Sequence, residues 1–310
     1  MAWLPTRAVR RLLLGLAASL LATAAYLDWP RIAAHWLFPP RAAALPATPQ
    51  LDLGSYAVSI EALPIPGLSA NASGLTYSQE TGTLFVAVNR PPALAELPVE
   101  GRLLRHIPLP AAVDPEGVTH VEGDLFAISD ESDNRLHWVR IRPGTPAVQA
   151  VDTTRLALDF SHLHNLGFEG LSWDESRAEM LVVNEKWPRR ILAVDGLLEQ
   201  GTVQASGVRV RNWNASGWLG PLGSDLASLS VHSRTGNLLI LSEESAAVSE
   251  YSRQGALLGV LPLWKGVGGL RHKIRQPEGI SVGPDDAIYL IAEPNLFYRF
   301  TKAGRPMPAS

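Results

Sequence analysis

Short apolar segments alternate with turns rich in Gly, Asp and Asn, and this pattern recurs five times along the chain. In each repeat a small or acidic residue precedes a Gly or Ser, and an apolar segment ends 13 to 15 residues after that Gly or Ser. The repeats begin at Ser73-Gly74, Glu116-Gly117, Glu169-Gly170, Ala227-Ser228 and Glu278-Gly279. The apolar segments are residues 84–89, 125–130, 180–185, 238–243 and 288–293. Short strands repeated with a period of 43 to 58 residues predict a β-propeller.

The number of strands predicts how the propeller closes. Each of the first four repeats contains four strand-like segments, whereas the last repeat contains only three before the chain ends. Residues 56–64 (YAVSIEALP) alternate like a strand but precede the first repeat. We expect this segment to be the outer strand of the last blade, because it would close the ring and remove an open sheet edge. The sequence thus predicts an all-β, five-bladed propeller of four-stranded blades over residues 56–303.

The N-terminal pattern is different and predicts a membrane segment. Three arginines, Arg7, Arg10 and Arg11, precede an uncharged apolar run over residues 12–27. This run has about 16 residues, fewer than the roughly 20 of a spanning helix, but aromatic and apolar residues continue to residue 38, as at a membrane–water interface. We expect residues 1–38 to form an uncleaved signal-anchor. A cleaved signal peptide and a buried soluble helix are the alternatives.

The position of the arginines predicts the orientation of the chain. Basic residues favour the cytoplasmic side, so we expect a single pass through a bacterial inner membrane with the large domain in the periplasm. If the segment is cleaved, the domain would be periplasmic or secreted. Residues 39–55 are rich in Pro, Ala and small polar residues, and they predict a semi-extended linker between the anchor and the propeller.

The composition argues against several classes of function. The formal net charge is −3 and no basic stripe is present, which argues against nucleic acid as a partner. The chain contains no cysteine, so disulfides, thiolate metal sites and thiol nucleophiles are excluded. No nucleophile elbow, P-loop or dinucleotide-binding fingerprint is present. The chemistry therefore depends on the residues that the repeats bring together.

Carboxylates recur at two positions of the repeat that a propeller would place at the same rim. The first strand of each blade lines the central channel and the second returns antiparallel, so the start of one lies beside the end of the other. Seven carboxylates are expected there: Glu116, Asp130, Glu169, Glu185, Glu243, Glu278 and Glu293. Two like charges about 4 Å apart repel by roughly 1 kcal/mol in water and about 4 kcal/mol at an effective dielectric constant of about 20. Such a rim therefore requires compensation.

A bound cation is one form of compensation. A hard divalent ion takes six to eight oxygen ligands, and Ca²⁺ fits this set better than Mg²⁺. Zinc is disfavoured, because the chain has no cysteine and no histidine recurs at the repeat position. The sequence predicts a calcium site in which Glu116, Glu169 and Glu278 rank first, since they occupy one equivalent place near the axis. A purely structural hydrogen-bonded ring and a proton-transfer site with raised pKa values are the alternatives.

Several segments resemble a known family. These are NASGLTYSQETGTLFVAVNRPP, DPEGVTH, GFEGLSW, LLILSEES, GGLRHKIRQPEGI and AEPNLFYRF. Over about residues 56–300 the chain resembles the SdiA-regulated, YjiK-like family of bacterial exported proteins. That resemblance implies a five-bladed propeller distantly similar to NHL-repeat proteins, a calcium ion in a shared site, and an N-terminal membrane segment or signal peptide. It implies no established biochemical activity.

Two functions are compatible with these observations. In the first, the anchored propeller is a calcium-binding module that presents its loop-bearing rim to an unidentified small molecule or protein. In the second, it is a calcium-dependent hydrolase of the lactonase or phosphodiesterase type, in which the ion polarises the substrate and activates water. The binding module is the function that we expect, since it needs neither an open coordination position nor a pocket beside the ion.

Overall fold

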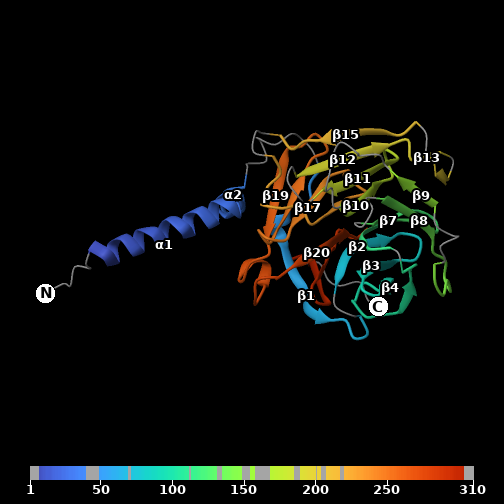
Figure 1. Cartoon of the computed structure of the whole chain (residues 1–310), viewed down its shortest axis with the longest axis horizontal. Helices are drawn as coiled ribbons and strands as arrows, with labels where there is room; N and C mark the ends of the chain where they lie inside the picture. Colours follow the sequence, from blue (N-terminus) through green and yellow to red (C-terminus); the bar gives the residue numbers. More distant parts are fainter. Residues whose placement is uncertain are drawn as a thin grey trace.

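The computed structural model describes most of the chain in several ranges. These are residues 7–39, 49–68, 71–111, 113–130, 135–148, 154–157, 168–184, 189–199, 201–203, 207–216 and 220–303. They form five four-stranded antiparallel sheets arranged around a central axis. Figure 1 looks onto this ring, with the inner strands β2, β10 and β20 near its middle. The predicted five-bladed propeller is therefore confirmed.

Four blades are built from strands consecutive along the chain except for one inserted hairpin. Blade 1 contains β2 (Ala72–Ser78), β3 (Thr83–Asn89), β4 (Pro92–Leu97) and β5 (Arg105–Pro108). Blade 2 contains β6 (Pro115–Glu122), β7 (Leu125–Asp130), β8 (Arg135–Arg140) and β9 (Thr154–Ala157). Blade 3 contains β10 (Phe168–Asp174), β11 (Glu179–Asn184), β12 (Arg190–Asp195) and β15 (Arg209–Trp213), with the hairpin β13 (Leu198–Glu199) and β14 (Thr202–Val203) inserted. Blade 4 contains β16 (Ser228–Val231), β17 (Leu238–Ser242), β18 (Ala247–Tyr251) and β19 (Leu257–Pro262).

The fifth blade joins the two ends of the propeller sequence. It contains β20 (Pro277–Val282), β21 (Ile288–Ala292), β22 (Leu296–Lys302) and, as its outer strand, β1 (Tyr56–Pro64). β1 pairs antiparallel with β22, from Tyr56 opposite Lys302 to Pro64 opposite Leu296. The predicted closure by residues 56–64 is confirmed. By pairing with β22, β1 gives the last blade its fourth strand and covers the edge of β22, which would otherwise be left unpaired.

The recurring glycine allows the inner strands to pack backbone against backbone. A Cβ atom added to Gly74 would lie 2.7 Å from the Glu116 carbonyl oxygen, and one added to Gly279 would lie 2.6 Å from the Ser73 carbonyl oxygen. At Gly117 the added atom would overlap the carbonyl oxygen of Glu169. Neighbouring inner strands therefore approach more closely than any residue with a side chain allows. This contact is the physical reason for the Gly in the repeat.

The segment before β1 is tied to blade 4. Glu250, which is fully buried, accepts hydrogen bonds from the Leu51 N–H at 2.9 and 3.0 Å and from Asn237 Nδ2 at 2.7 Å. Asn237 Nδ2 also donates to the Pro49 carbonyl oxygen at 2.8 Å. Leu51 and Leu53 are buried in the cluster between blades 4 and 5. The end of the predicted linker is thus packed into the domain.

The Glu250 carboxyl predicts a pH dependence of stability. Burial raises the pKa of Glu250 above its ordinary value of 4.5, because the charged form loses its hydration. A pKa raised in the folded state means that its contribution to stability is complete below pH 4.5 and is lost as the pH rises through the folded-state pKa. We therefore expect Glu250→Gln to become progressively more stable relative to wild type as the pH rises from 4.5 to 8. Urea unfolding of the full chain in detergent at a series of pH values measures this difference. Parallel pH curves would contradict it.

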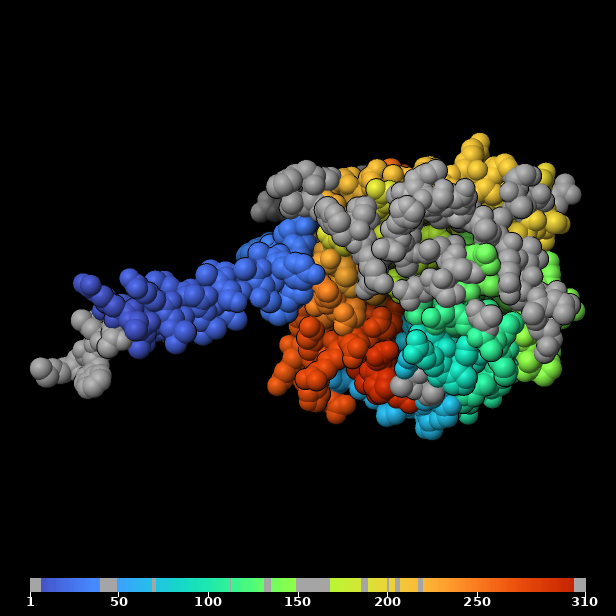
Figure 2. All heavy atoms as spheres, in the orientation of Figure 1, coloured from blue at the N-terminus to red at the C-terminus, as the bar shows by residue number. Residues whose placement is uncertain are grey.

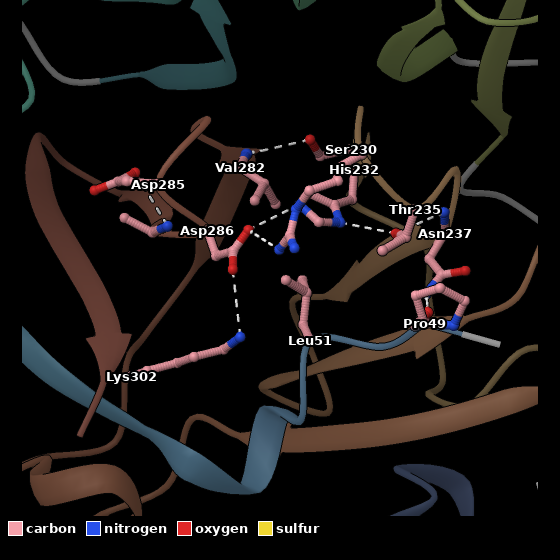
Figure 3. Close-up of polar contacts among 12 residues, drawn as sticks. Pro49, Leu51, Ser230, His232, Thr235, Asn237, Val282, Asp285, Asp286 and Lys302 are labelled. Carbon is pink, nitrogen blue, oxygen red and sulfur yellow. Dashed lines mark hydrogen bonds and ion pairs between the residues drawn. The ribbon is translucent and has the colours of Figure 1, made fainter. Parts of the chain in front are cut away.

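Blades 4 and 5 are joined by an ionic network around Asp286 (Figure 3). Asp286, which is 4% exposed, contacts His232 Nε2 at 3.2 Å, Arg234 Nη2 and Lys302 Nζ at 3.3 Å. The backbone carbonyl oxygen of Asp286 accepts a hydrogen bond from the Tyr56 hydroxyl at 2.7 Å. Burial acts to raise the pKa of Asp286, but the hydrogen bonds from Arg234 and Lys302 outweigh it and the pKa lies below its ordinary value. Asp286 thus connects blade 4 and blade 5 through its carboxylate, and the closing strand through its backbone carbonyl.

Two helices precede the propeller. The helix α1 (Arg7–Tyr26) has 20 residues and is long and apolar enough to cross a membrane, by length and composition. None of its side chains is buried, and it projects from the side of the ring (Figures 1 and 2). This exposure does not match the alternative of a buried soluble helix. A signal sequence would pass the same test, so the uncleaved anchor stays a prediction.

The second helix, α2 (Trp29–Leu37), packs against β19 at the outside of blade 4. Ile32 is fully buried in a cluster shared by blades 3 and 4, and the Trp29 and Trp264 rings meet edge to face at 6.2 Å. Asp28 accepts hydrogen bonds from the Gly223 N–H at 3.1 Å and from Arg31 at 2.7 Å. Part of the aromatic stretch expected at the membrane interface is therefore part of the domain.

Candidate functional site

The start of the inner strands forms the rim where the sequence predicts calcium. Glu116, Glu169 and Glu278 are each the second residue of their strand, on β6, β10 and β20, and each is half-buried. Gly117 packs against the Glu169 backbone, and Gly74 of blade 1 packs against the Glu116 backbone. Gly279 in turn packs against Ser73 of blade 1. The three glutamates therefore lie at equivalent places on the inner strands of blades 5, 2 and 3, and blade 1, which carries Ser73 at this place, lies between blades 5 and 2.

The other predicted carboxylates are engaged in different ways. Asp130 lies opposite Pro115 in the β6–β7 ladder, but it is 1% exposed and its carboxylate contacts His137 Nε2 at 2.9 Å and the Asp114 N–H at 3.3 Å. The Glu293 carboxylate accepts a hydrogen bond from Gln276 Nε2 at 3.2 Å, and the Glu293 N–H donates one to the Gln276 carbonyl oxygen at 3.0 Å. Glu243 follows β17, as expected. Glu185 lies outside the described residues.

Two polar residues, Asn89 and Asp225, were not among the predicted ligands. Asn89, at the end of β3, donates a hydrogen bond from Nδ2 to Glu116 Oε1 at 2.7 Å. Its own Oδ1 is buried, and no donor reaches it from the residues that the structure describes. A buried acceptor left without a donor is costly, about 1–3 kcal/mol. The amide oxygen beside a carboxylate is therefore the kind of group that a cation would satisfy.

Asp225 is a buried acid that lies three residues before β16 of blade 4. It is 5% exposed and accepts hydrogen bonds from the Ser242 hydroxyl and from the N–H groups of Glu243 at 2.9 Å and Glu244 at 3.2 Å. Burial raises the pKa of Asp225 above its ordinary value. The repeat alignment places Ala227 at the equivalent position, and the acid two residues earlier was the available signal in the sequence.

The donor set decides which ion these residues suit. Within the described ranges, no three His, Cys, Asp or Glu side chains form a group that could hold a metal ion by themselves. Calcium also accepts amide oxygens, backbone carbonyls and water as ligands. Glu116 with the unsatisfied Asn89 oxygen matches this all-oxygen chemistry, so the residues present fit calcium better than a metal that prefers nitrogen or sulfur.

The fold defines the class of protein. Five four-stranded blades closed by an N-terminal strand make this chain a five-bladed β-propeller with an N-terminal apolar helix. A family model described as SdiA-regulated matches residues 49–301. The chain therefore belongs to the SdiA-regulated family, as its sequence motifs indicated.

The solved structures that match this chain are distant from it in sequence. A luciferin-regenerating enzyme has a TM-score of 0.48 at 13% identity over 80% of this chain and 96% of its own. A calcium-binding protein, regucalcin from Agrobacterium tumefaciens, has a TM-score of 0.48 at 12% identity over 78% and 93%. A gluconolactonase from Xanthomonas campestris has a TM-score of 0.46 at 14% identity over 81% and 93%.

Proposed function

We propose that this protein is a membrane-anchored, calcium-binding β-propeller that works as a binding module. The ion binds at the mouth of the channel where the inner strands begin. Glu116 and Asn89 hold it, and Glu169 from the adjacent blade 3 and Glu278 from blade 5 complete the set of charged ligands. The bound ion neutralises the carboxylates and orders the rim, which then binds a small molecule or a protein partner.

The unsatisfied oxygen of Asn89 is the observation that carries this proposal. Its amide nitrogen is fixed by Glu116 Oε1, so its oxygen is held in one direction without a donor. A purely structural hydrogen-bonded ring would satisfy this acceptor, whereas a calcium site would leave it for the ion. Glutamates at equivalent places on three of the five inner strands supply the negative charge that a divalent cation requires.

The character of α1 supports the proposed location of the protein in the membrane. Its exposed leucines suit the hydrocarbon region of a membrane, and Arg7, Arg10 and Arg11 at its start favour the cytoplasmic side. The propeller would then lie in the periplasm, held at the membrane by the packing of α2 on blade 4.

Calcium titration by calorimetry tests the proposal on the full chain in detergent. We expect saturable binding to wild type and at least about tenfold weaker binding to Glu116→Gln and to Glu278→Gln, since each removes a charged ligand. Glu199→Gln, at an exposed position of β13, is the matched control and is expected to bind as wild type does. Equal affinity in all four proteins would refute this site.

Asn89→Asp separates a calcium site from a structural role. The substitution places a second carboxylate beside Glu116, which repels without an ion and attracts one when it is present. We expect lower thermal stability than wild type in EDTA, and tighter calcium binding. Destabilisation that calcium does not reverse would indicate a structural ring instead.

The hydrolytic alternative is tested separately. Wild type and the variants are assayed with lactones and phosphodiesters, and turnover of any of these substrates would show that the protein is a hydrolase and not only a binding module.

A further inference from the structure

A ring of five hydroxyl groups surrounds the channel near its other end. One Thr or Ser of each blade lies two residues after the repeat Gly or, in blade 4, the equivalent Ser. These residues are Thr76, Thr119, Ser172, Ser230 and Ser281. All five are less than one-tenth exposed. We call this set the hydroxyl ring.

Every hydroxyl of the ring accepts a backbone hydrogen bond from the adjacent blade. The donors are the N–H groups of His120 to Thr76 (3.1 Å), Trp173 to Thr119 (3.0 Å), Val231 to Ser172 (2.9 Å), Val282 to Ser230 (3.3 Å) and Tyr77 to Ser281 (2.8 Å). The contacts run without a gap through all five blades. This ring therefore holds the inner strands in register and fixes the position of each hydroxyl oxygen.

The hydroxyl hydrogens are left for another partner. A Ser or Thr hydroxyl can donate one hydrogen bond in addition to accepting two. Among the residues that the structure describes, only Thr119 also donates, to the His120 carbonyl oxygen at 3.3 Å. The other four buried hydroxyls line a pocket with their donors unused, which indicates that the floor of this pocket prefers a group that accepts hydrogen bonds.

The pocket opens where the inner strands end, opposite the proposed calcium rim. Its volume is about 580 Å³, within the usual range for small-molecule sites. The half-buried rings of Tyr77 and Trp173 line its wall. The exposed carboxylates of Glu80, Glu122 and Glu175 lie at its mouth, and its described lining includes no Lys or Arg.

We propose that this pocket binds a neutral polyhydroxylated ligand, a saccharide. Sugar hydroxyls accept hydrogen bonds from the hydroxyl ring and donate charge-assisted ones to the carboxylates at the mouth. The Trp173 ring offers an apolar face for the C–H groups of a sugar. An anion would meet three carboxylates without a compensating cation. A simple cation would leave the hydroxyl donors unused. Only a ligand with many groups that both donate and accept satisfies the floor and the mouth together.

Titration of the full chain with glucose, N-acetylglucosamine and maltose, followed by saturation-transfer NMR, tests the proposal. A polyoxyethylene detergent is required, since maltoside headgroups are saccharides themselves. We expect saturable binding of at least one of these sugars. Glu122→Gln and Glu175→Gln are expected to weaken it about tenfold, because each loses a charged acceptor. Trp173→Ala is expected to weaken it similarly while keeping the backbone N–H that donates to Thr119.

Two control variants separate a loss of sugar binding in this pocket from effects of folding and of calcium. Glu100→Gln changes an exposed glutamate outside this pocket and is expected to bind sugar as wild type does. Glu116→Gln at the calcium rim is also expected to leave sugar binding unchanged. Absence of saturable binding by all three sugars would overturn the proposal. So would binding of putrescine in their place, which would assign the pocket to organic cations.

Discussion

Replacing Gly117 with alanine is expected to destabilise the propeller by about 3 kcal/mol or more, or to prevent it from folding. The added Cβ would overlap the Glu169 carbonyl oxygen and lie 2.7 Å from the Ser129 hydroxyl oxygen. The first of these is backbone of the neighbouring blade and cannot rotate away. Blades 2 and 3 would have to separate at the axis, which would disturb the contacts of every other inner strand. Urea unfolding followed by circular dichroism measures the loss.

Gly259→Ala is the matched control for this prediction. Gly259 lies within β19, and an added Cβ would make only ordinary contacts, the nearest being Leu53 Cβ at 3.6 Å. We expect that variant to keep wild-type stability or to gain slightly, since alanine restricts the unfolded chain more than glycine does. If Gly117→Ala were as stable as Gly259→Ala, the close packing of inner strands would not be required.

Asp286→Ala is expected to lower the free energy of unfolding by about 1.5–3 kcal/mol, the second largest effect. The substitution leaves the buried His232 without its carboxylate partner, and it removes the same partner from the partly exposed Lys302 and the exposed Arg234 (Figure 3). Asp195→Ala removes an ion pair with Arg209 whose side chains are 25% and 82% exposed, and it should cost less than about 1 kcal/mol. Urea unfolding of both variants at pH 7 gives the comparison, and equal losses would contradict it.

The same joint predicts the sign of an acid effect. The pKa of Asp286 is lowered in the folded state, so its contribution to stability is complete above its ordinary pKa of 3.8 and is lost as the pH falls through the folded-state value. The difference in unfolding free energy between wild type and Asp286→Ala is therefore expected to shrink below pH 3.8. A difference that stays constant down to pH 2 would show that packing, not charge, makes the contact.

The repeat pattern predicted most of the fold because every blade needs the same residue types at the same places. Glycine recurs where inner strands meet, and apolar segments recur where second strands are buried. The count of strands predicted the closing strand, because an unpaired edge has to be covered. The packing of Ile32 and Leu51 into the domain could not be predicted from the repeats. Each is a single apolar residue in a segment whose composition is typical of an anchor or a linker.

By itself, the sequence determined the architecture: five blades, their order, and the strand that closes them. It also determined which carboxylates occupy equivalent places, since equivalence is a property of the repeat. Only the tertiary structure decided the partners of each side chain. Asp130 contacts His137, Asn89 donates a hydrogen bond to Glu116, and Asp225 accepts hydrogen bonds from the N–H groups of Glu243 and Glu244. It alone disclosed the hydroxyl ring, because each of its hydrogen bonds joins residues of different blades. Periodicity describes a blade, whereas these contacts depend on how blades face one another around the axis.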